Sequence, residues 1–205
     1  MDMEFFRKAE GVPARLAILS ASFHPVTKAH MALAQAALEH ACEVLFVLPR
    51  RFPHKNYDKV TLDDRLRMVL AATAHDPRFS VAVSEGGLFI EIARECRQHY
   101  PPSTRLAFVC GADAAERVAK WDYGDPDAFS RMLQEFELWV ADRNGDYEPP
   151  ESYRKHIRKL RIPPEYRNIS ATEVRRRIAA GEDWEGLVPN TVRALVREIY
   201  ASSGE

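Results

Sequence analysis

SFHPVTKAH, residues 22–30, follows the apolar run Leu16–Leu19 and precedes an alanine- and leucine-rich segment that predicts a helix. A strand, a tight turn and the start of a helix bring backbone N–H groups together with the positive end of a helix dipole. This combination favours the binding of a phosphate group. Thr27 is a good N-cap, so His30 would lie in the first turn with its ring toward a bound anion. A capping threonine beside a packed histidine is the plainer interpretation, but the fixed spacing of hydroxyls and proline in this turn favours function.

The rest of the chain predicts an α/β fold. Short unbroken apolar runs alternate with amphipathic segments of helical period, which is typical of βαβ units. We therefore expect a Rossmann-like, doubly wound parallel sheet with a C-terminal helical segment. Strands are expected at Leu16–Leu19, Val44–Leu48, Phe79–Val83, Leu106–Cys110 and Leu138–Ala141, and helices at Met31–Ala41, Leu62–Ala74, Phe89–Arg97, Ala112–Ala119, in a run ending at Ala180, and at Val192–Tyr200.

The 205 residues suit one domain. Residues 1–14 are expected as an N-terminal extension, 15–165 as the α/β domain, and 166–205 as a helical part of the same domain. Within the α/β domain, residues 50–59 and the proline-rich, charged residues 144–164 are expected as loops.

Composition narrows the class of protein. The chain is 46% hydrophobic and 29% charged, with a net charge of −1. The overall composition and charge therefore do not indicate a nucleic-acid or membrane partner. Basic residues cluster at 154–161 and 175–177. Such runs usually form a solvated face, and the alternative is a local site for an anion. Cys42, Cys96 and Cys110 show neither metal nor disulfide spacing, so we expect buried thiols in a cytoplasmic protein. Residues 1–13 are charged and lack an apolar segment, so we expect no secretory leader, and no apolar run reaches membrane-spanning length. The sequence does not decide whether the protein forms a homo-oligomer.

Several candidate residues follow strands at one edge of the expected sheet. Ligands of open parallel sheets bind beyond the carboxyl ends of the strands. Residues 22–30, 53–55 and 111–113 each follow a strand there, so we expect them to share one site. Lys55 offers a point charge for phosphate and Asp113 a carboxylate for a ribose hydroxyl. Taken alone, each is better explained plainly, Lys55 as a solvated lysine and Asp113 as an acid that begins a helix.

A second group lies nearer the C-terminus. Ser170 or Thr172 would cap a helix while presenting hydroxyls to phosphate, and Arg175 lies one turn further on. The plain alternative is a capping box between Ser170 and Glu173. Trp121 would either stack on an aromatic ring or fill core.

Taken together, these segments resemble a known family. SFHPVTKAH is similar to the S/T-F-D/N-P-x-T/H-x-G/M-H motif of adenylyltransferases in the nucleotidyltransferase superfamily, and ISATEVR, residues 169–175, to their I-S-S/A-T-x-x-R motif. Further segments resemble motifs of nicotinate or nicotinamide mononucleotide adenylyltransferases: Gly111-Ala112-Asp113, Trp121, Val140-Ala141-Asp142-Arg143, Pro53-His54-Lys55 and Leu187-Val188-Pro189. The similarity runs from about Leu16 to Tyr200.

The resemblance implies a reaction and residue roles. The phosphate of nicotinate or nicotinamide mononucleotide attacks the α-phosphorus of ATP in line, giving the NAD-pathway dinucleotide and pyrophosphate without an enzyme nucleophile, and Mg²⁺ is bound through the phosphates rather than by a protein metal site. The implied catalytic residues are His30, Lys55 and Arg175. The implied ATP-binding residues are Ser22, Phe23, Thr27, His30, Gly111, Asp113, Ser170, Thr172 and Arg175, and those for the mononucleotide are Ser22, Lys55, Leu88, Trp121 and Arg143.

Four places depart from the family pattern. Ala21 and Ala29 replace glycines, His24 replaces an aspartate or asparagine, and residues 87–89, Gly-Leu-Phe, replace Ser-Tyr-Thr ahead of the third helix. The last change leaves open another phosphate-ester acceptor or the use of CTP. Ala21 and His24 leave open a nucleotide-binding sensor with impaired catalysis.

Overall fold

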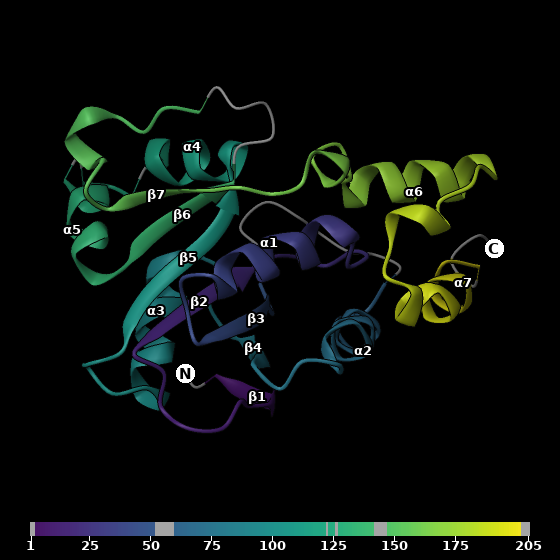
Figure 1. Cartoon of the computed structure of the whole chain (residues 1–205), viewed down its shortest axis with the longest axis horizontal. Coiled ribbons are helices and arrows are strands. Elements are labelled where there is room, and N and C mark those ends of the chain that lie inside the picture. Colours follow the sequence, from purple (N-terminus) through teal and green to yellow (C-terminus); the bar gives the residue numbers. More distant parts are fainter. Residues whose placement is uncertain (1–2, 52–59, 122, 126, 142–146, 202–205) are drawn as a thin grey trace.

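A computed structural model describes residues 3–51, 60–121, 123–125, 127–141 and 147–201. Within these ranges a seven-stranded sheet has the order β1-β4-β3-β2-β5-β6-β7, and all neighbouring strands are parallel except the pair β1–β4 (Figure 1). The strands are β1 (Glu4–Arg7), β2 (Arg15–Ser20), β3 (Glu43–Pro49), β4 (Phe79–Ser84), β5 (Arg105–Gly111), β6 (Glu137–Ala141) and β7 (Ile157–Leu160). The helices are α1 (Lys28–Leu38), α2 (Leu62–Thr73), α3 (Phe89–His99), α4 (Ala112–Lys120), α5 (Ala128–Glu135), α6 (Ala171–Ala180) and α7 (Arg193–Ala201).

Two apolar cores cover the two faces of the sheet. Successive strand residues point to opposite faces, so in β2 Ala17 and Leu19 join one core while Leu16 and Ile18 join the other. Helices α1, α2, α6 and α7 pack on the first core, and α3, α4 and α5 on the second. This arrangement confirms the doubly wound α/β fold and the C-terminal helical segment.

The five apolar runs are strands, but three other elements differ from the sequence-based expectation. Part of the expected N-terminal extension forms β1, an edge strand antiparallel to β4. The expected loop at 144–164 contains β7, which the apolar pattern missed because only Ile157 and Leu160 are buried while Arg158 and Lys159 face solvent. The sequence pattern also did not predict helix α5, whose eight residues lie in the segment after α4.

The thiols also differ in part from the expectation. Cys96 and Cys110 are buried, but Cys42 is exposed. Burial raises the pKa of both buried thiols above its usual range, that of Cys110 to about 12. The two buried thiols therefore stay protonated at neutral pH.

No helix in the described ranges has the length and apolar character needed to cross a membrane.

The order of the strands fixes where a ligand binds. From β2 the chain winds outward through β3 to β4, and from β5 it winds the other way through β6 to β7. The switch therefore lies between β2 and β5, which are adjacent and parallel. Ligands of doubly wound sheets bind beyond the carboxyl ends of the strands at such a switch point. Those ends here are Ser20 and Gly111.

Candidate active site

The turn between β2 and α1 is held by its own buried aromatic ring. Phe23 has φ +47°, in the left-handed region that few residues other than glycine adopt, and its side chain is fully buried. The ring packs against His30 at a centroid distance of 5.1 Å and against Phe46 at 5.8 Å. Ala21 does not share this positive φ, so its methyl group causes no backbone strain of that kind. The turn is thus a fixed element of the core.

Thr27 and His30 cap helix α1 reciprocally, and this determines how His30 is protonated. The Thr27 hydroxyl accepts from the His30 backbone N–H at 3.4 Å, and the Thr27 backbone N–H donates to His30 Nδ1 at 3.0 Å. A backbone N–H only donates, so Nδ1 accepts and the neutral ring carries its proton on Nε2. The half-buried ring can therefore donate a hydrogen bond from Nε2, the nitrogen not used in the cap.

Arg65 holds the same turn from helix α2. Its guanidinium donates from Nη1 to the carbonyl of Ser22 at 3.1 Å and from Nε to the carbonyl of Thr61 at 3.3 Å, and the residue is only 4% exposed. Sequence reasoning missed this residue. The available signal was an arginine on the apolar stripe of a helix, in register with Met68 and Val69.

Arg175 brings helix α6 to the turn. Its Nη1 donates to the carbonyl of His24 at 2.6 Å, and its Nη2 to the Thr172 hydroxyl at 3.3 Å. Ser170 caps α6, because its hydroxyl accepts from the backbone N–H of Glu173 at 3.1 Å. The two motif segments, 145 positions apart between His30 and Arg175, therefore meet in space.

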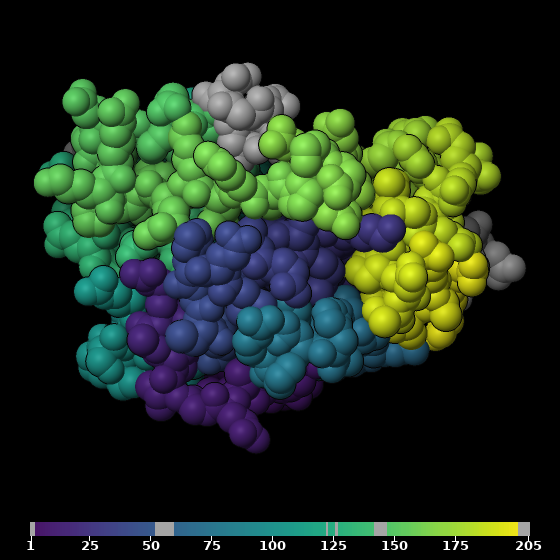
Figure 2. Space-filling view, in the orientation of Figure 1, coloured from purple at the N-terminus to yellow at the C-terminus, as the bar shows by residue number. Residues whose placement is uncertain are grey.

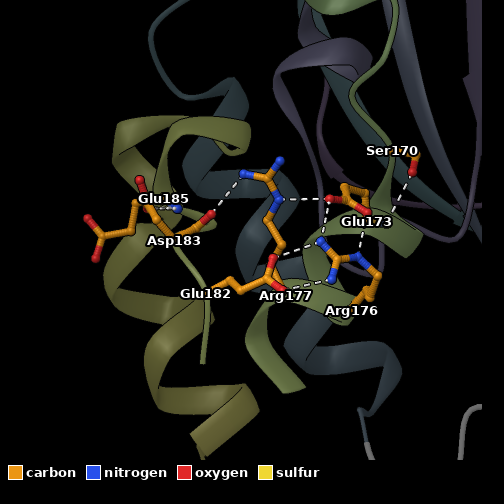
Figure 3. A network of polar contacts seen from close by, with 7 residues as sticks. All are labelled: Ser170, Glu173, Arg176, Arg177, Glu182, Asp183 and Glu185. Carbon is orange, nitrogen blue, oxygen red and sulfur yellow. Dashed lines mark hydrogen bonds and ion pairs between the residues drawn. The ribbon is translucent and has the colours of Figure 1, made fainter. Parts of the chain in front are cut away.

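The other two arginines of the basic triplet turn elsewhere. Glu173 pairs with Arg176 and with Arg177, and Arg176 also pairs with Glu182 (Figure 3). The hydrogen bonds from Arg176 and Arg177 lower the pKa of Glu173 to about 2. This network pairs Arg176 and Arg177 with carboxylates. Arg175 is the member of the triplet that contacts the turn.

Gly111 ends β5 on the other side of the switch point. A Cβ built on this residue would meet nothing within 4 Å, and its φ of −80° is open to any residue, so the space above it is available to a ligand. Asp113 follows in the first turn of α4 and is exposed. Trp121 lies at the far end of this nine-residue helix, 36% exposed, about 13 Å along the axis from its start.

The loop before α3 is organised by two glutamates. The backbone N–H groups of Gly87 and Leu88 donate to Glu91 Oε2 at 3.0 and 2.9 Å, and that of Gly86 donates to Glu95 Oε1 at 2.9 Å. A Cβ on Gly86 would come within 2.5 Å of the Glu91 Cβ, so glycine is required there by close approach. Leu88 is half-buried at the start of α3. Lys55 and Arg143, also expected in the site, lie outside the described residues.

A separate cleft of about 750 Å³ lies along the outer face of α1. Lys28, Met31 and Gln35 line it on α1. It does not include His30 or Arg175, so it is distinct from the turn.

Among the described residues there is no group of three or more side chains suited to hold a metal ion.

A doubly wound sheet with this turn at its switch point defines the class of Rossmann-like α/β proteins. The cytidylyltransferase-like family model matches residues 18–177. A "probable nicotinate-nucleotide adenylyltransferase" of Thermus thermophilus is 32% identical over 191 residues, covering 90% of this chain and 97% of the relative. Another from Solibacter usitatus is 33% identical over 193 residues, with the same two coverages. The chain therefore belongs to the cytidylyltransferase-like family, in the group that nicotinate-nucleotide adenylyltransferases form.

A solved structure shares the fold at lower identity. Nicotinic acid mononucleotide adenylyltransferase of Plasmodium falciparum, complexed with NaAD, superposes with a TM-score of 0.70 at 17% identity, covering 93% of this chain and 98% of that one. The same enzyme complexed with APC also gives 0.70, at 18% identity.

Proposed function

We propose that this protein transfers the adenylyl group of ATP to nicotinate mononucleotide, with nicotinamide mononucleotide as the alternative acceptor. An oxygen of the mononucleotide phosphate attacks the α-phosphorus of ATP, the new P–O–P bond forms as the bond to the β-phosphate breaks, and pyrophosphate leaves. The family and the names of its relatives support this reaction. The observation that carries it is the meeting of His30 and Arg175 at one turn beside the switch point.

Each described group has a part in this proposal. His30 Nε2–H donates to the α-phosphate, where negative charge builds up in the transition state. Arg175, already oriented by the His24 carbonyl and the Thr172 hydroxyl, binds the triphosphate with its remaining N–H groups. Gly111 leaves room for the adenosine. No side chain needs to act as a nucleophile, so positioning and charge stabilisation supply the rate.

The remaining roles follow the resemblance. Ser22, Phe23, Thr27 and Ser170 line the phosphate path, Asp113 holds the ribose, and Leu88 and Trp121 contact the pyridine side, with Lys55 and Arg143 beyond the described residues. The hydroxyl and guanidinium donors here suit phosphate oxygens, so Mg²⁺ is expected on the phosphates themselves, where it would neutralise part of their charge. A cytoplasmic location and the absence of nucleic-acid partners stay predictions.

The first experiment measures pyrophosphate release from ATP and Mg²⁺ with nicotinate mononucleotide, nicotinamide mononucleotide or neither. We expect release only with an acceptor, and faster with the nicotinate form. Arms with CTP test the alternative donor. Absence of release in every ATP arm, with ATP still bound, would instead identify a nucleotide sensor.

A matched pair of variants then tests the site. Arg175→Lys loses the guanidinium fork at the turn, and we expect the KM for ATP to rise about 10- to 100-fold, the scale of a charge-assisted hydrogen bond. Arg177→Lys makes the same chemical change in the Glu173 network, away from the turn. Its KM for ATP should match the wild type. Equal effects of the two substitutions would remove Arg175 from the ATP site.

A further inference from the structure

The side chain of His24 contacts the last helix of the chain. The hydroxyl of Tyr200, in the last turn of α7, lies 2.6 Å from His24 Nδ1. The two rings also stack, with centroids 5.4 Å apart and planes inclined by 23°. These residues are 176 positions apart, so the contact exists only because the C-terminal segment, yellow in Figure 2, folds back to lie beside the region that contains α1.

His24 is therefore held at its side chain as well as at its backbone. Its carbonyl accepts the 2.6 Å hydrogen bond from Arg175, and its ring bonds to Tyr200. A phenol hydroxyl both donates and accepts, so the bond to Nδ1 persists whichever nitrogen of the ring carries the proton. Because the ring and the carbonyl belong to one residue, the bond to Tyr200 restricts the position of His24, whose carbonyl is the acceptor that orients Arg175.

We propose that Tyr200 is a positioning residue for ATP binding, acting through His24 on Arg175. This inference rests on the proposed function, since it assigns ATP to the Arg175 site. It also accounts for the departure at position 24, because the ring of His24 stacks on Tyr200 in a way that the short side chain of an aspartate or asparagine does not. Helix α7 therefore contributes to the ATP site through Tyr200.

Tyr200→Phe is the direct test, because it keeps the ring stack and removes only the hydroxyl. We expect the Kd for ATP, measured by titration calorimetry, and the KM for ATP both to rise about three- to tenfold, the scale of one hydrogen bond. The KM for the mononucleotide should stay unchanged. In a His24→Ala background, Tyr200→Phe should weaken ATP binding less than it does in the wild type, because the bond from Tyr200 to His24 is already absent.

Ile199→Val is the matched control, since Ile199 is 7% exposed in the same helical turn and packs in the first core. It lowers stability slightly and should leave ATP binding at the wild-type level. The inference is overturned if Tyr200→Phe binds ATP like the wild type, or if Ile199→Val weakens ATP binding as much. Wild-type protein that binds ATP without forming dinucleotide would remove the proposed reaction, while the Kd comparison would still decide the role of Tyr200. Wild-type protein that does not bind ATP would overturn both.

Discussion

Substituting His30 separates its two roles, because its two ring nitrogens have different partners. His30→Ala removes both the Nε2–H donor and the Nδ1 acceptor of the Thr27 N–H. Loss of one transition-state donor corresponds to about a 100- to 1,000-fold fall in kcat. Thr27 is only 1% exposed, so its N–H is left unsatisfied at a cost of about 1–3 kcal/mol of unfolding free energy, or about 2–12 °C in Tm.

His30→Asn isolates the catalytic role. The introduced amide can place Oδ1 where Nδ1 lies and accept from the Thr27 N–H, but it has no donor at the Nε2 position. We therefore expect a Tm within about 2 °C of wild type, the scale below 1 kcal/mol, together with a kcat at least about 100-fold lower. Thermal unfolding and steady-state pyrophosphate release measure the two quantities. A His30→Asn enzyme with more than about a tenth of the wild-type kcat would refute the argument that Nε2–H stabilises the transition state.

Three further outcomes are expected. Gly111→Ala should leave Tm unchanged, since its Cβ meets no protein atom, but should raise the KM for ATP if adenosine approaches there; an unchanged KM removes Gly111 from the site. The pKa of Glu173 is lowered to about 2, so its contribution to stability is present above its unfolded pKa of about 4.5 and is lost as the pH falls toward 2. Glu173→Gln should show a weaker loss of stability over that range, measured by urea unfolding at several pH values. Native protein should react with a thiol reagent at Cys42 alone, with Cys96 and Cys110 reacting only after unfolding.

The parts of the fold that sequence predicts are those with local signals. Strand β3 is a buried apolar run, and α2 carries a threonine cap with acids in its first turn. Strand β7 lacks such a signal, because two of its four residues are charged and face solvent. Its pairing with β6 is a tertiary fact. Helix α5 did carry one, since Phe129, Met132 and Leu133 are buried at helical spacing, but over only eight residues.

The site divides in the same way. The cap between Thr27 and His30 and the cap at Ser170 are local, and the structure contains both. The bonds from Arg65 and Tyr200 to the turn join residues 43 and 176 positions apart, so no spacing rule reveals them. Such contacts follow only from the way α2 and α7 pack on the first core.

The most direct test of the proposed reaction follows the fate of the phosphorus atoms. The protein is incubated with Mg²⁺, nicotinate mononucleotide and ATP labelled either at the α- or at the γ-phosphate, and the products are separated. Attack at the α-phosphorus predicts that the α-label appears in the dinucleotide and the γ-label in pyrophosphate. Label released as inorganic phosphate, or no labelled dinucleotide while ATP is bound, would contradict adenylyl transfer.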